Sequence, residues 1–570
     1  MDIQILDISS DDIDNEFVLT IYGKNTNNTS VACNIKGFKP YFYLKVPNSY
    51  TEKFCKDILL KNIDYNYKKH IDIKNKYFKL RSYKEFFNYH VDEYDNVKKF
   101  SFIKLVFYNY RGFLHIKKKI IEYYNKNLDT TNKIIQSFIK CNHDQCNSCL
   151  YEANVPPVIK FIHDTNIKPS SWIHISDYKL IEESDFKVVS IETLINHIKP
   201  ISVDITSKYK IASFDIECDS SHGDFPMAIK NFKKPALDLI ETYTSKMKEY
   251  NEYTIEQKIY IIKCIVYNLF DITFEDKIDI DKIYLSTDKP IISDDFSLFT
   301  DEFVNQLDNC NLDKKTRDNM IKYIADSFDK LKYNKYKKIK IEGDPIIQIG
   351  TVFKEYGTNN TKRVIIVIAY DSNDTDICDD IDNVLVIRCR DERELLMKWI
   401  DLINEEDPDF ITGYNILGFD FNYVHNRVKE LFNDSNDNII IGMKNINYNL
   451  GRLNIDCRDK YYNKKNIYKK VFRRDTEENN DFNDQSYINM DGRIIFDVQK
   501  EIEKSHNLES YKLDSVSSHF MRGFINKYDF ILNLDNNISL LKLYTDTIRQ
   551  LKIGDYITIN TYSNIGEMLL

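Results

Sequence analysis

Two carboxylates lie two residues apart on an apolar stretch of the chain, Asp215 and Glu217 within Ser213–Cys218. Side chains alternate between the two faces of a β-strand, so both carboxylates project from one face while Phe214 and Ile216 point into a core. Like charges held side by side repel each other, and a cation between them removes that cost. Hard oxygen ligands of this kind suit Mg²⁺ or Mn²⁺. The alternative is a strand end whose acids simply face water.

A third carboxylate, Asp420, follows a turn that contains Gly413 and Gly418. The apolar pair Phe410–Ile411 before this turn predicts a short strand. Apolar residues after it recur at helical spacing and predict a helix, at Phe421, Val424, Val428 and Leu431. Asp420 is therefore expected at or next to a helix N-terminus, where an ordinary capping role is the alternative to metal binding.

The elements between these carboxylates can be read from apolar patterning. Strands are predicted at Ile346–Phe353, Val364–Tyr370 and Val384–Cys389, and a helix at Glu392–Asn404. The order is then strand, strand, strand, helix, strand, helix, with carboxylates on the first strand and at the start of the last helix. This is the element order of an RNase H-like nuclease, whose catalytic acids gather around paired metals. We expect an α/β (α+β) domain with a mixed sheet.

Several ordered motifs resemble those of family B DNA polymerases, over about residues 10–525 with interruptions. Phe214–Cys218 and Gly223–Pro226 resemble the first exonuclease motif. Asp344–Gly350 resembles the strand that follows it, and Gly413–Asp420 resembles the second motif. Stretches similar to the one before the third motif are Gly492-Arg493, Asp497 and Ser510–Val516. Stretches similar to the N-terminal domain of delta-type and large DNA virus polymerases are Gly37–Tyr43, Tyr151–Asn154 and Pro169–Ile173.

The resemblance implies 3′–5′ exonucleolytic hydrolysis of DNA by two metal ions, Mg²⁺ or Mn²⁺. It makes Asp215, Glu217 and Asp420 the catalytic residues and metal ligands. It also implies that the primer 3′ end is held by three residues of the second motif, namely Tyr414, Asn415 and Phe419. Stacking on an aromatic ring tolerates any base, which suits a proofreader. The alternatives are a turn-stabilising role for Asn415 and a core-anchoring role for Phe419.

The chain departs from the family pattern at the third exonuclease motif, Tyr-x-x-x-Asp, whose Asp completes the metal site. Tyr511 and Asp514 are three residues apart rather than four and belong to the segment before that motif. No palm, fingers or thumb is found, and residues 545–570 are expected to begin a β insertion with a strand at Lys552–Ile559. We therefore expect a chain that stops within a domain, and no templated nucleotide incorporation by it alone.

The expected organisation has two domains. Residues 1–205 form a β-rich N-terminal domain, and residues 206–570 form an incomplete exonuclease domain. Within the second, residues 231–342 have few glycines and predict a helical insertion, with helices at Ile255–Leu269 and Thr316–Leu331.

Composition bounds the class of protein. The chain has 570 residues, 42% of them hydrophobic, and can bury a large core. There is no run of about twenty apolar residues, so no membrane partner is expected. Its 11 cysteines are mostly scattered singly, which favours a reducing compartment over a disulfide framework. Asn, Ile, Lys, Tyr and Asp dominate and suggest an AT-rich genome. With the resemblance, these features indicate an intracellular protein of a giant virus, at a replication site in the host cytoplasm or nucleus.

Two further groups of residues each allow two interpretations, a basic stretch and a cluster of cysteines with a histidine. The net charge of −9 does not exclude DNA, because phosphate affinity comes from local basic surface. Basic and aromatic residues alternate over Arg458–Arg474, as on a single-strand groove, although a solvated loop is the alternative. Four possible zinc ligands fall within nine residues, at Cys141, His143, Cys146 and Cys149. Cys146 and Cys149 have knuckle spacing, but a loop with reduced thiols is favoured.

Two classes of function fit the sequence. The first is the N-terminal, proofreading part of a viral replicative DNA-directed DNA polymerase. Its partners would be primer and template DNA, a C-terminal polymerase half with palm, fingers and thumb, and a sliding clamp. The second is a non-catalytic DNA-binding module of a split polymerase that lacks the third metal carboxylate. A free-standing exonuclease is the weaker third option, since a simple nuclease has no need of the N-terminal domain.

Overall fold

The structure is a computed structural model. It describes residues 1–46, 53, 79–83, 101–125, 150–181, 188–220, 225–249, 253–274, 276–309, 314–370, 378–432, 450–452, 468–473, 483–488, 490–533 and much of 538–569. These residues divide into two compact units, Met1–Phe496 and Asp497–Leu570. The first unit contains three separate hydrophobic cores.

The first core lies under a seven-stranded sheet at the N-terminus, in the order β11-β8-β1-β2-β3-β10-β9. The strands are β1 (Asp2–Ile13), β2 (Glu16–Asn25), β3 (Ser30–Lys36), β8 (Trp172–Ile175), β9 (Lys179–Leu180), β10 (Val189–Leu194) and β11 (Ile198–Ile201). A second, four-stranded sheet follows the order β5-β6-β4-β7, with β4 (Tyr41–Val46), β5 (Lys79–Tyr83), β6 (Ser101–Val106) and β7 (Leu150–Tyr151). Helices α3 (Tyr110–Asn125) and α5 (Pro157–Thr165) complete a region that is rich in strands, as the sequence predicts.

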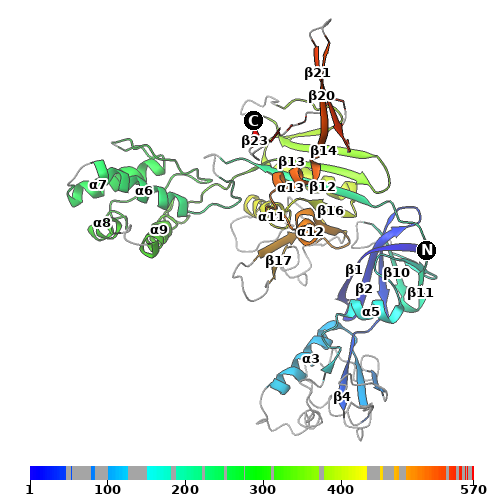
Figure 1. Ribbon diagram of the computed structural model, residues 1–570. Coiled ribbons are helices and arrows are strands. Elements are labelled where there is room, and N and C mark those ends of the chain that lie inside the picture. The colour runs from blue at the N-terminus through cyan, green and yellow to red at the C-terminus, as the bar shows by residue number, and fades with distance from the viewer. Residues whose placement is uncertain are drawn as a thin grey trace, which may run out of the picture. The chain divides into compact units, whose positions relative to one another are not determined.

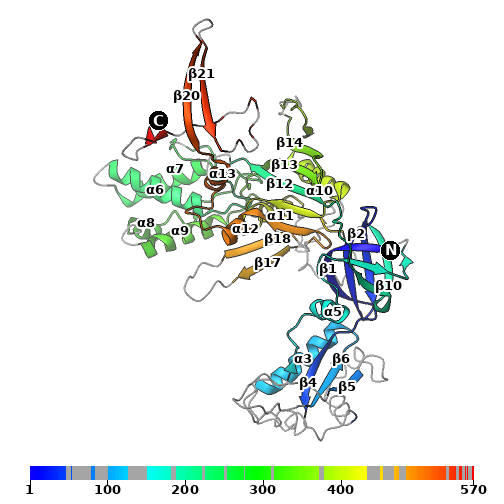
Figure 2. The same ribbon diagram turned by 45° about the vertical axis from the view of Figure 1, so that its right-hand side comes forward.

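The second core lies under a six-stranded mixed sheet in the order β15-β14-β13-β12-β16-β19. Its strands are β12 (Lys210–Cys218), β13 (Ile346–Glu355), β14 (Thr361–Ile368), β15 (Leu385–Cys389), β16 (Phe410–Gly413) and β19 (Ile494–Asp497). Figure 2 shows β12, β13 and β14 side by side. β12 pairs antiparallel with β13 and parallel with β16, so the first predicted strand lies inside the sheet. The RNase H-like α/β arrangement that the element order predicts is confirmed.

Two helices pack on the apolar side of this sheet, α10 (Glu392–Glu406) and α11 (Asp420–Leu431). Phe214 of β12 contacts Trp399 of α10 and Phe421 of α11, with ring centroids 5.1 and 5.3 Å apart. All three rings are buried. Burial of three large aromatic side chains at one point fixes where α11 begins relative to β12.

The third core belongs to a helical module between β12 and β13 (Figure 1, green), built from α6 (Lys233–Glu249), α7 (Ile255–Leu269), α8 (Asp301–Asp308) and α9 (Lys314–Phe328). The helices predicted at 255–269 and 316–331 are therefore confirmed, the second within three residues at each end. This module buries its own apolar side chains around Ile265, Phe303 and Phe328. The domain bounds 1–205, 206–570 and 231–342 themselves stay predictions.

Both ends of the helical module are tied to the sheet domain. The backbone N–H of Asp344 donates to the carbonyl of Met227 at 2.9 Å, and Met227 N–H donates back to the Asp344 carboxylate at 2.9 Å. Lys230 pairs with Asp344 at 2.5 Å. Arg427 of α11 donates to the Ala228 carbonyl at 3.0 Å and pairs with the buried Glu392 at 2.6 Å. Entry and exit of the module are thus fixed against the helix that carries Asp420.

The second unit contains α12 (Val498–Ser505), α13 (Leu513–Met521), an antiparallel hairpin of β20 (Ile525–Asn533) and β21 (Ile538–Thr545), and the short pair β22 (Thr561–Tyr562) and β23 (Met568–Leu569). The strand predicted at Lys552–Ile559 is wrong at the residues described there. Ile553 and Gly554 form a turn, because Gly554 adopts φ +103°, and Ile557 and Ile559 are not in a strand. Strand structure begins earlier, at Ile525. Elsewhere a hairpin joins β17 (Tyr468–Arg473) and β18 (Asn483–Ile488).

A membrane span is not found either. None of the helices in the described ranges is both long and apolar enough to cross a bilayer.

Candidate active site

The strand β12 presents Asp215 and Glu217 on its exposed face, while Phe214 and Ile216 are buried beneath the sheet. The structure thus places the two carboxylates on one side of the strand, as the alternation of residues predicts. Opposite Asp215, on β13, is Gly350, whose missing side chain leaves open space where a Cβ would stand. This glycine keeps the neighbouring strand clear of the acids.

A tight turn delivers Asp420 to the same place. Asn415 adopts a left-handed backbone with φ 61°, and its carbonyl accepts the N–H groups of Gly418 and Phe419, both at 2.9 Å. A Cβ on Gly418 would lie 2.3 Å from the Asn415 side-chain oxygen. A Cβ on Gly413 would lie 2.6 Å from the Phe214 carbonyl. Only glycine lets the turn fold this closely onto β12, so that α11 starts beside the strand.

Asp420, the first residue of α11, is buried with 2% of its surface exposed. Burial, and after it the negative charge of Asp215, raise its pKa to about 7. Its Oδ1 is buried and has no hydrogen-bond partner among the described residues. A buried oxygen without a partner is costly, and such an oxygen is typical of a site that binds a ligand.

The structure therefore brings two of the three predicted ligands together. Asp215 and Asp420 interact directly, since a hydrogen bond between their side chains contributes to the raised pKa of Asp420. Glu217 lies two residues along the same face of β12. Within the described ranges, however, no three Asp, Glu, His or Cys side chains form a group that could hold a metal ion. The donor set of hard carboxylate oxygens and the unpartnered Asp420 Oδ1 nevertheless fit a divalent cation such as Mg²⁺ or Mn²⁺.

The second motif also places its aromatic residue at the edge of this site. Phe419 is half-buried, and its ring meets the rings of Phe225 at 5.7 Å and Tyr423 at 5.2 Å. It packs against the sheet core, which agrees with the core-anchoring alternative, yet one of its neighbours is open to solvent. Tyr414 and Asn415 are partly buried in the turn before it.

Sequence reasoning missed Phe225 as a site residue. Its side chain is 76% exposed, although it stacks edge-on against Phe419. The available signal was its place in the Gly223–Pro226 part of the first motif, ten residues after Asp215.

A buried ion-pair network, also missed, holds the segment before β16. Arg452 is fully buried and pairs with Asp407 at 2.9 Å and Asp409 at 2.7 Å. Arg493 pairs with Asp407 at 2.8 Å. Burial alone raises the pKa of Asp407, but the two guanidinium groups outweigh it and hold that pKa below its ordinary value. The network fixes the start of the strand that leads to Asp420.

The N-terminal sheet joins the same network. Ser30 donates to Asp407 at 2.6 Å, and Lys24 pairs with the fully buried Asp409 at 3.1 Å. Arg452 donates to Ser30 at 3.1 Å. Lys24 of β2 and Ser30 of β3 therefore bind the Asp407–Asp409 segment of the sheet domain.

Two predicted clusters cannot be placed. The possible zinc ligands Cys141, His143, Cys146 and Cys149 lie outside the described residues, and so does most of the basic stretch Arg458–Arg474, of which only the strand β17 is described. The cysteines that are described carry free thiols, at Cys33, Cys218, Cys264, Cys378 and Cys389.

The strand order of the mixed sheet and the carboxylates of β12 and α11 define an exonuclease-type domain of the RNase H-like class. The family model for the DNA polymerase family B exonuclease domain matches residues 148–235 and 240–516, more than half of the chain. The chain therefore belongs to this family of DNA polymerase exonuclease-region proteins.

Relatives agree with this assignment. The chain is 28% identical to the DNA polymerase of Pyramimonas orientalis virus over 97% of its own length and 43% of the relative. It is 26% identical to the DNA polymerase of Phaeocystis pouchetii virus, over 96% of the chain and 55% of the relative. It is 22% identical to the DNA polymerase delta catalytic subunit of Plasmodium falciparum, over 89% of the chain and 33% of the relative. The chain thus spans about half the length of the viral relatives.

A solved structure is also similar, that of the family B DNA polymerase from the archaeon Pyrobaculum calidifontis. The TM-score is 0.38 at 12% identity, over 76% of this chain and 33% of that one.

Proposed function

We propose that this chain carries the 3′–5′ exonuclease of a viral replicative DNA polymerase and removes mispaired nucleotides from the primer end. The observation that supports this most is the contact between Asp215 and Asp420, in which Asp420 is buried, has its pKa raised to about 7 and has one oxygen without a partner among the described residues. The match to the family B exonuclease domain supports a catalytic role for this pair of carboxylates.

In this proposal Asp215, Glu217 and Asp420 hold two ions of Mg²⁺ or Mn²⁺, which when bound would activate a water and stabilise the leaving 3′ oxygen. A cation held beside Asp215 would favour the ionised form of Asp420, since a positive charge lowers the pKa that burial and Asp215 raise. The buried rings of Phe214 and Phe421 hold β12 and α11 at a fixed separation. The carboxylates are thereby kept in position before substrate arrives.

The turn residues would bind the terminal nucleotide. Phe419 offers a ring face at the edge of the site, and such stacking accepts any base. Asn415 has a side-chain amide close to the Gly418 backbone, and Tyr414 lies next to it in the turn. These three residues would hold the frayed 3′ end while the carboxylates act on its phosphodiester.

The wider activity proposed is that of the relatives, DNA-directed DNA synthesis with primer and template. It would need the polymerase part that the viral relatives contain beyond the matched region, and a sliding clamp would be a further partner. The site of action would be where viral DNA is replicated in the host cell. Viral relatives matched over 97% and 96% of the chain support this proposal.

A second candidate is a DNA-binding module without catalysis. One observation favours it, namely that the described residues hold no group of three metal-ligating side chains. In this case the chain would bind the primer strand but leave it intact.

Trimming of a 5′-labelled single strand separates the two candidates. We expect shortening from the 3′ end with Mg²⁺ or Mn²⁺, loss of at least a hundredfold in rate in Asp215→Ala, and an unchanged rate in Asp382→Ala, an exposed aspartate of a loop. Strand binding without shortening by the wild-type chain would reject the exonuclease in favour of the binding module.

A further inference from the structure

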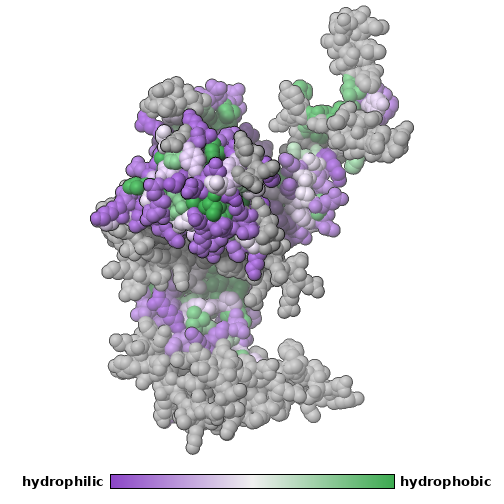
Figure 3. All heavy atoms as spheres, turned by 90° about the vertical axis from the view of Figure 1, so that its left-hand side faces the viewer, coloured by the Kyte–Doolittle hydropathy of each residue, from purple (hydrophilic) through white to green (hydrophobic). Residues whose placement is uncertain are grey.

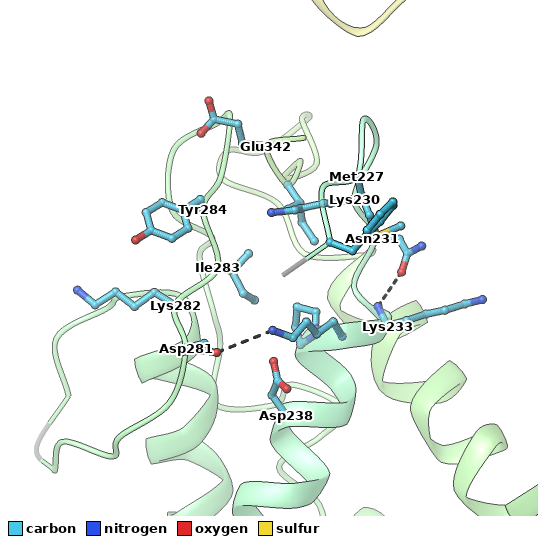
Figure 4. Close-up of a pocket in the computed structure, with 14 residues that line it drawn as sticks. Met227, Lys230, Asn231, Lys233, Asp238, Asp281, Lys282, Ile283, Tyr284 and Glu342 are labelled. Atoms are coloured by element: carbon cyan, nitrogen blue, oxygen red, sulfur yellow. Dashed lines mark hydrogen bonds and ion pairs between the residues drawn. The ribbon is translucent and has the colours of Figure 1, made fainter. Parts of the chain in front are cut away.

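A pocket of about 410 Å³ lies at the base of the helical module, where the chain leaves β12 and returns to β13. One wall is the segment from Phe225 to Asn231, a second is Asp281–Tyr284, and the start of α6 forms a third. Figure 4 shows Lys230 and Ile283 pointing into the pocket, with Tyr284 and Glu342 at its rim. Its size suits one unit of a larger ligand.

The pocket is rigidly connected to the candidate active site. Met227 and Lys230, which line it, are bound to the buried Asp344. Tyr423 of α11 donates to the Asp344 carbonyl at 3.0 Å, only three residues from Asp420. These contacts fix the pocket wall relative to the helix that begins with Asp420.

Phe225 belongs to both places. It lines the pocket, and its ring lies 5.7 Å from that of Phe419 at the edge of the carboxylate site. Its exposed fraction of 76% leaves most of this ring available to a ligand. A chain-like ligand whose end reaches Asp215 and Asp420 can therefore pass over Phe225 into the pocket.

The polar side chains suit a phosphate chain more than a neutral ligand. Four lysines line the pocket, and three of them form ion pairs: Lys230 with Asp344, Lys234 with Asp281 and Lys282 with Asp271. The fourth is Lys233. Within the described ranges, no carboxylate forms an ion pair with Lys233. In Figure 4 its side chain extends away from the pocket, and it also lines a second hollow together with Lys322. Basic side chains thus continue from one hollow to the next.

The coloured surface in Figure 3 is mostly hydrophilic, with a small group of hydrophobic residues among the hydrophilic ones. Aromatic and apolar surface bordered by lysines is the combination that binds single strands without regard to sequence.

We propose that this pocket and the hollow beside it bind single-stranded DNA on the 5′ side of the terminal nucleotide, with Phe225 and Tyr284 contacting bases in the pocket and Lys233, which lines both, contacting phosphate between them. The inference rests on the proposed function, because it takes the strand's 3′ end to lie at Asp215 and Asp420. The helical module would then add contacts to a strand whose 3′ end lies in the exonuclease site.

The test measures binding of 5′-fluorescein dT12 by anisotropy, using the 570-residue chain with Asp215→Ala to prevent trimming. Lys233→Glu and Tyr284→Ala are expected to raise the Kd about tenfold each, as loss of a stacking or phosphate contact does. Lys277→Glu and Tyr336→Ala are the matched controls, because both residues are exposed and line neither hollow, and they should stay within twofold. Thermal unfolding of every variant verifies its fold.

Two further arms separate the possible outcomes. Free dTMP supplies only the terminal nucleotide, so its inhibition of dT12 binding should differ less than twofold between variants. If Lys233→Glu and Tyr284→Ala bind dT12 like their controls, or weaken only the binding of free dTMP, the inference is wrong. Failure of the proposed function gives a different result, namely no Asp215-dependent trimming by the wild-type chain while the pocket variants still lose affinity for dT12.

Discussion

At the scale of single residues, the unusual group is Asp420. An aspartate at a helix start normally faces solvent and accepts backbone hydrogen bonds. Here it is 2% exposed, and burial together with Asp215 raises its pKa to about 7. The residue is held in an environment that penalises its own charge, which is common where a protein binds a cation or handles a proton.

This environment predicts a pH-dependent stability for the metal-free chain. The unfolded carboxyl has its ordinary pKa of 3.8 while the folded one has a pKa of about 7, so folding takes up a proton between these values. Stability contributed by that proton is full below pH 4 and is lost as the pH rises to 7. Asp420→Asn removes the charge and should raise the free energy of unfolding at pH 8, by up to about 4 kcal/mol for a shift of about three pKa units at about 1.4 kcal/mol each.

Urea unfolding without divalent ions at pH 8 and pH 4 provides the measurement. The advantage of Asp420→Asn over wild type should shrink at pH 4, and Asp382→Asn should change stability by less than about 0.5 kcal/mol at either pH. A variant less stable than wild type at pH 8 would mean that the carboxylate is a stabilising cap.

The carboxylates could be predicted from the sequence because the two-residue spacing of Asp215 and Glu217 needs only the geometry of a strand. The burial of Asp420 could not, because it depends on how α11 packs against β12. Phe225 was missed for a similar reason, since only the fold brings its ring to Phe419.

At the scale of elements, the turn between β16 and α11 decides where Asp420 lies. The strands and helices around it were predicted to within a few residues, because their apolar patterns are long and regular. The conformation of the turn was not, since it depends on contacts that sequence spacing does not express. Gly413, for example, passes so close to β12 that a Cβ would meet the Phe214 carbonyl.

Gly413→Ala should therefore destabilise the chain. Its Cβ would stand 2.5 Å from the Ile416 side chain and 2.6 Å from the Phe214 carbonyl oxygen, so the turn has to move. We expect a loss of about 1–3 kcal/mol in the free energy of unfolding, as for other overpacked sites, and weaker trimming because Asp420 shifts with the turn.

Gly350→Ala is the matched control on the neighbouring strand, because a Cβ there meets nothing within 4 Å. Urea unfolding should show that this variant loses less than about 1 kcal/mol. Equal losses for the two glycine variants would show that the close approach of Gly413 to β12 has no special cost.

At the scale of the whole molecule, three hydrophobic cores lie within Met1–Phe496. The sequence predicts their strand-rich, mixed and helical character, because each has its own periodic pattern. The ion pairs that join them could not be predicted. Arg452 meets Ser30 and Asp407 across 422 and 45 residues of chain, and no local pattern marks such partners.

Two of these sets of contacts hold the elements around Asp420. The Arg452 network holds the segment before β16, the Asp344 contacts hold the ends of the helical module, and both lead to Asp420. Buried ion pairs of this kind add little net stability, but they fix one arrangement where an apolar contact could slide. The arrangement that they fix is the one in which Asp215 and Asp420 meet.

Anomalous scattering from Mn²⁺ can locate a metal ion between Asp215 and Asp420. Crystals of the 570-residue chain with a bound oligonucleotide, grown with Mn²⁺, should show an anomalous peak within about 2.3 Å of Asp420 Oδ1 and next to Asp215. The peak should be absent in crystals of Asp420→Asn grown in the same way. A wild-type crystal with Mn²⁺ and an ordered strand but no peak between Asp215 and Asp420 would contradict a metal site at these two carboxylates.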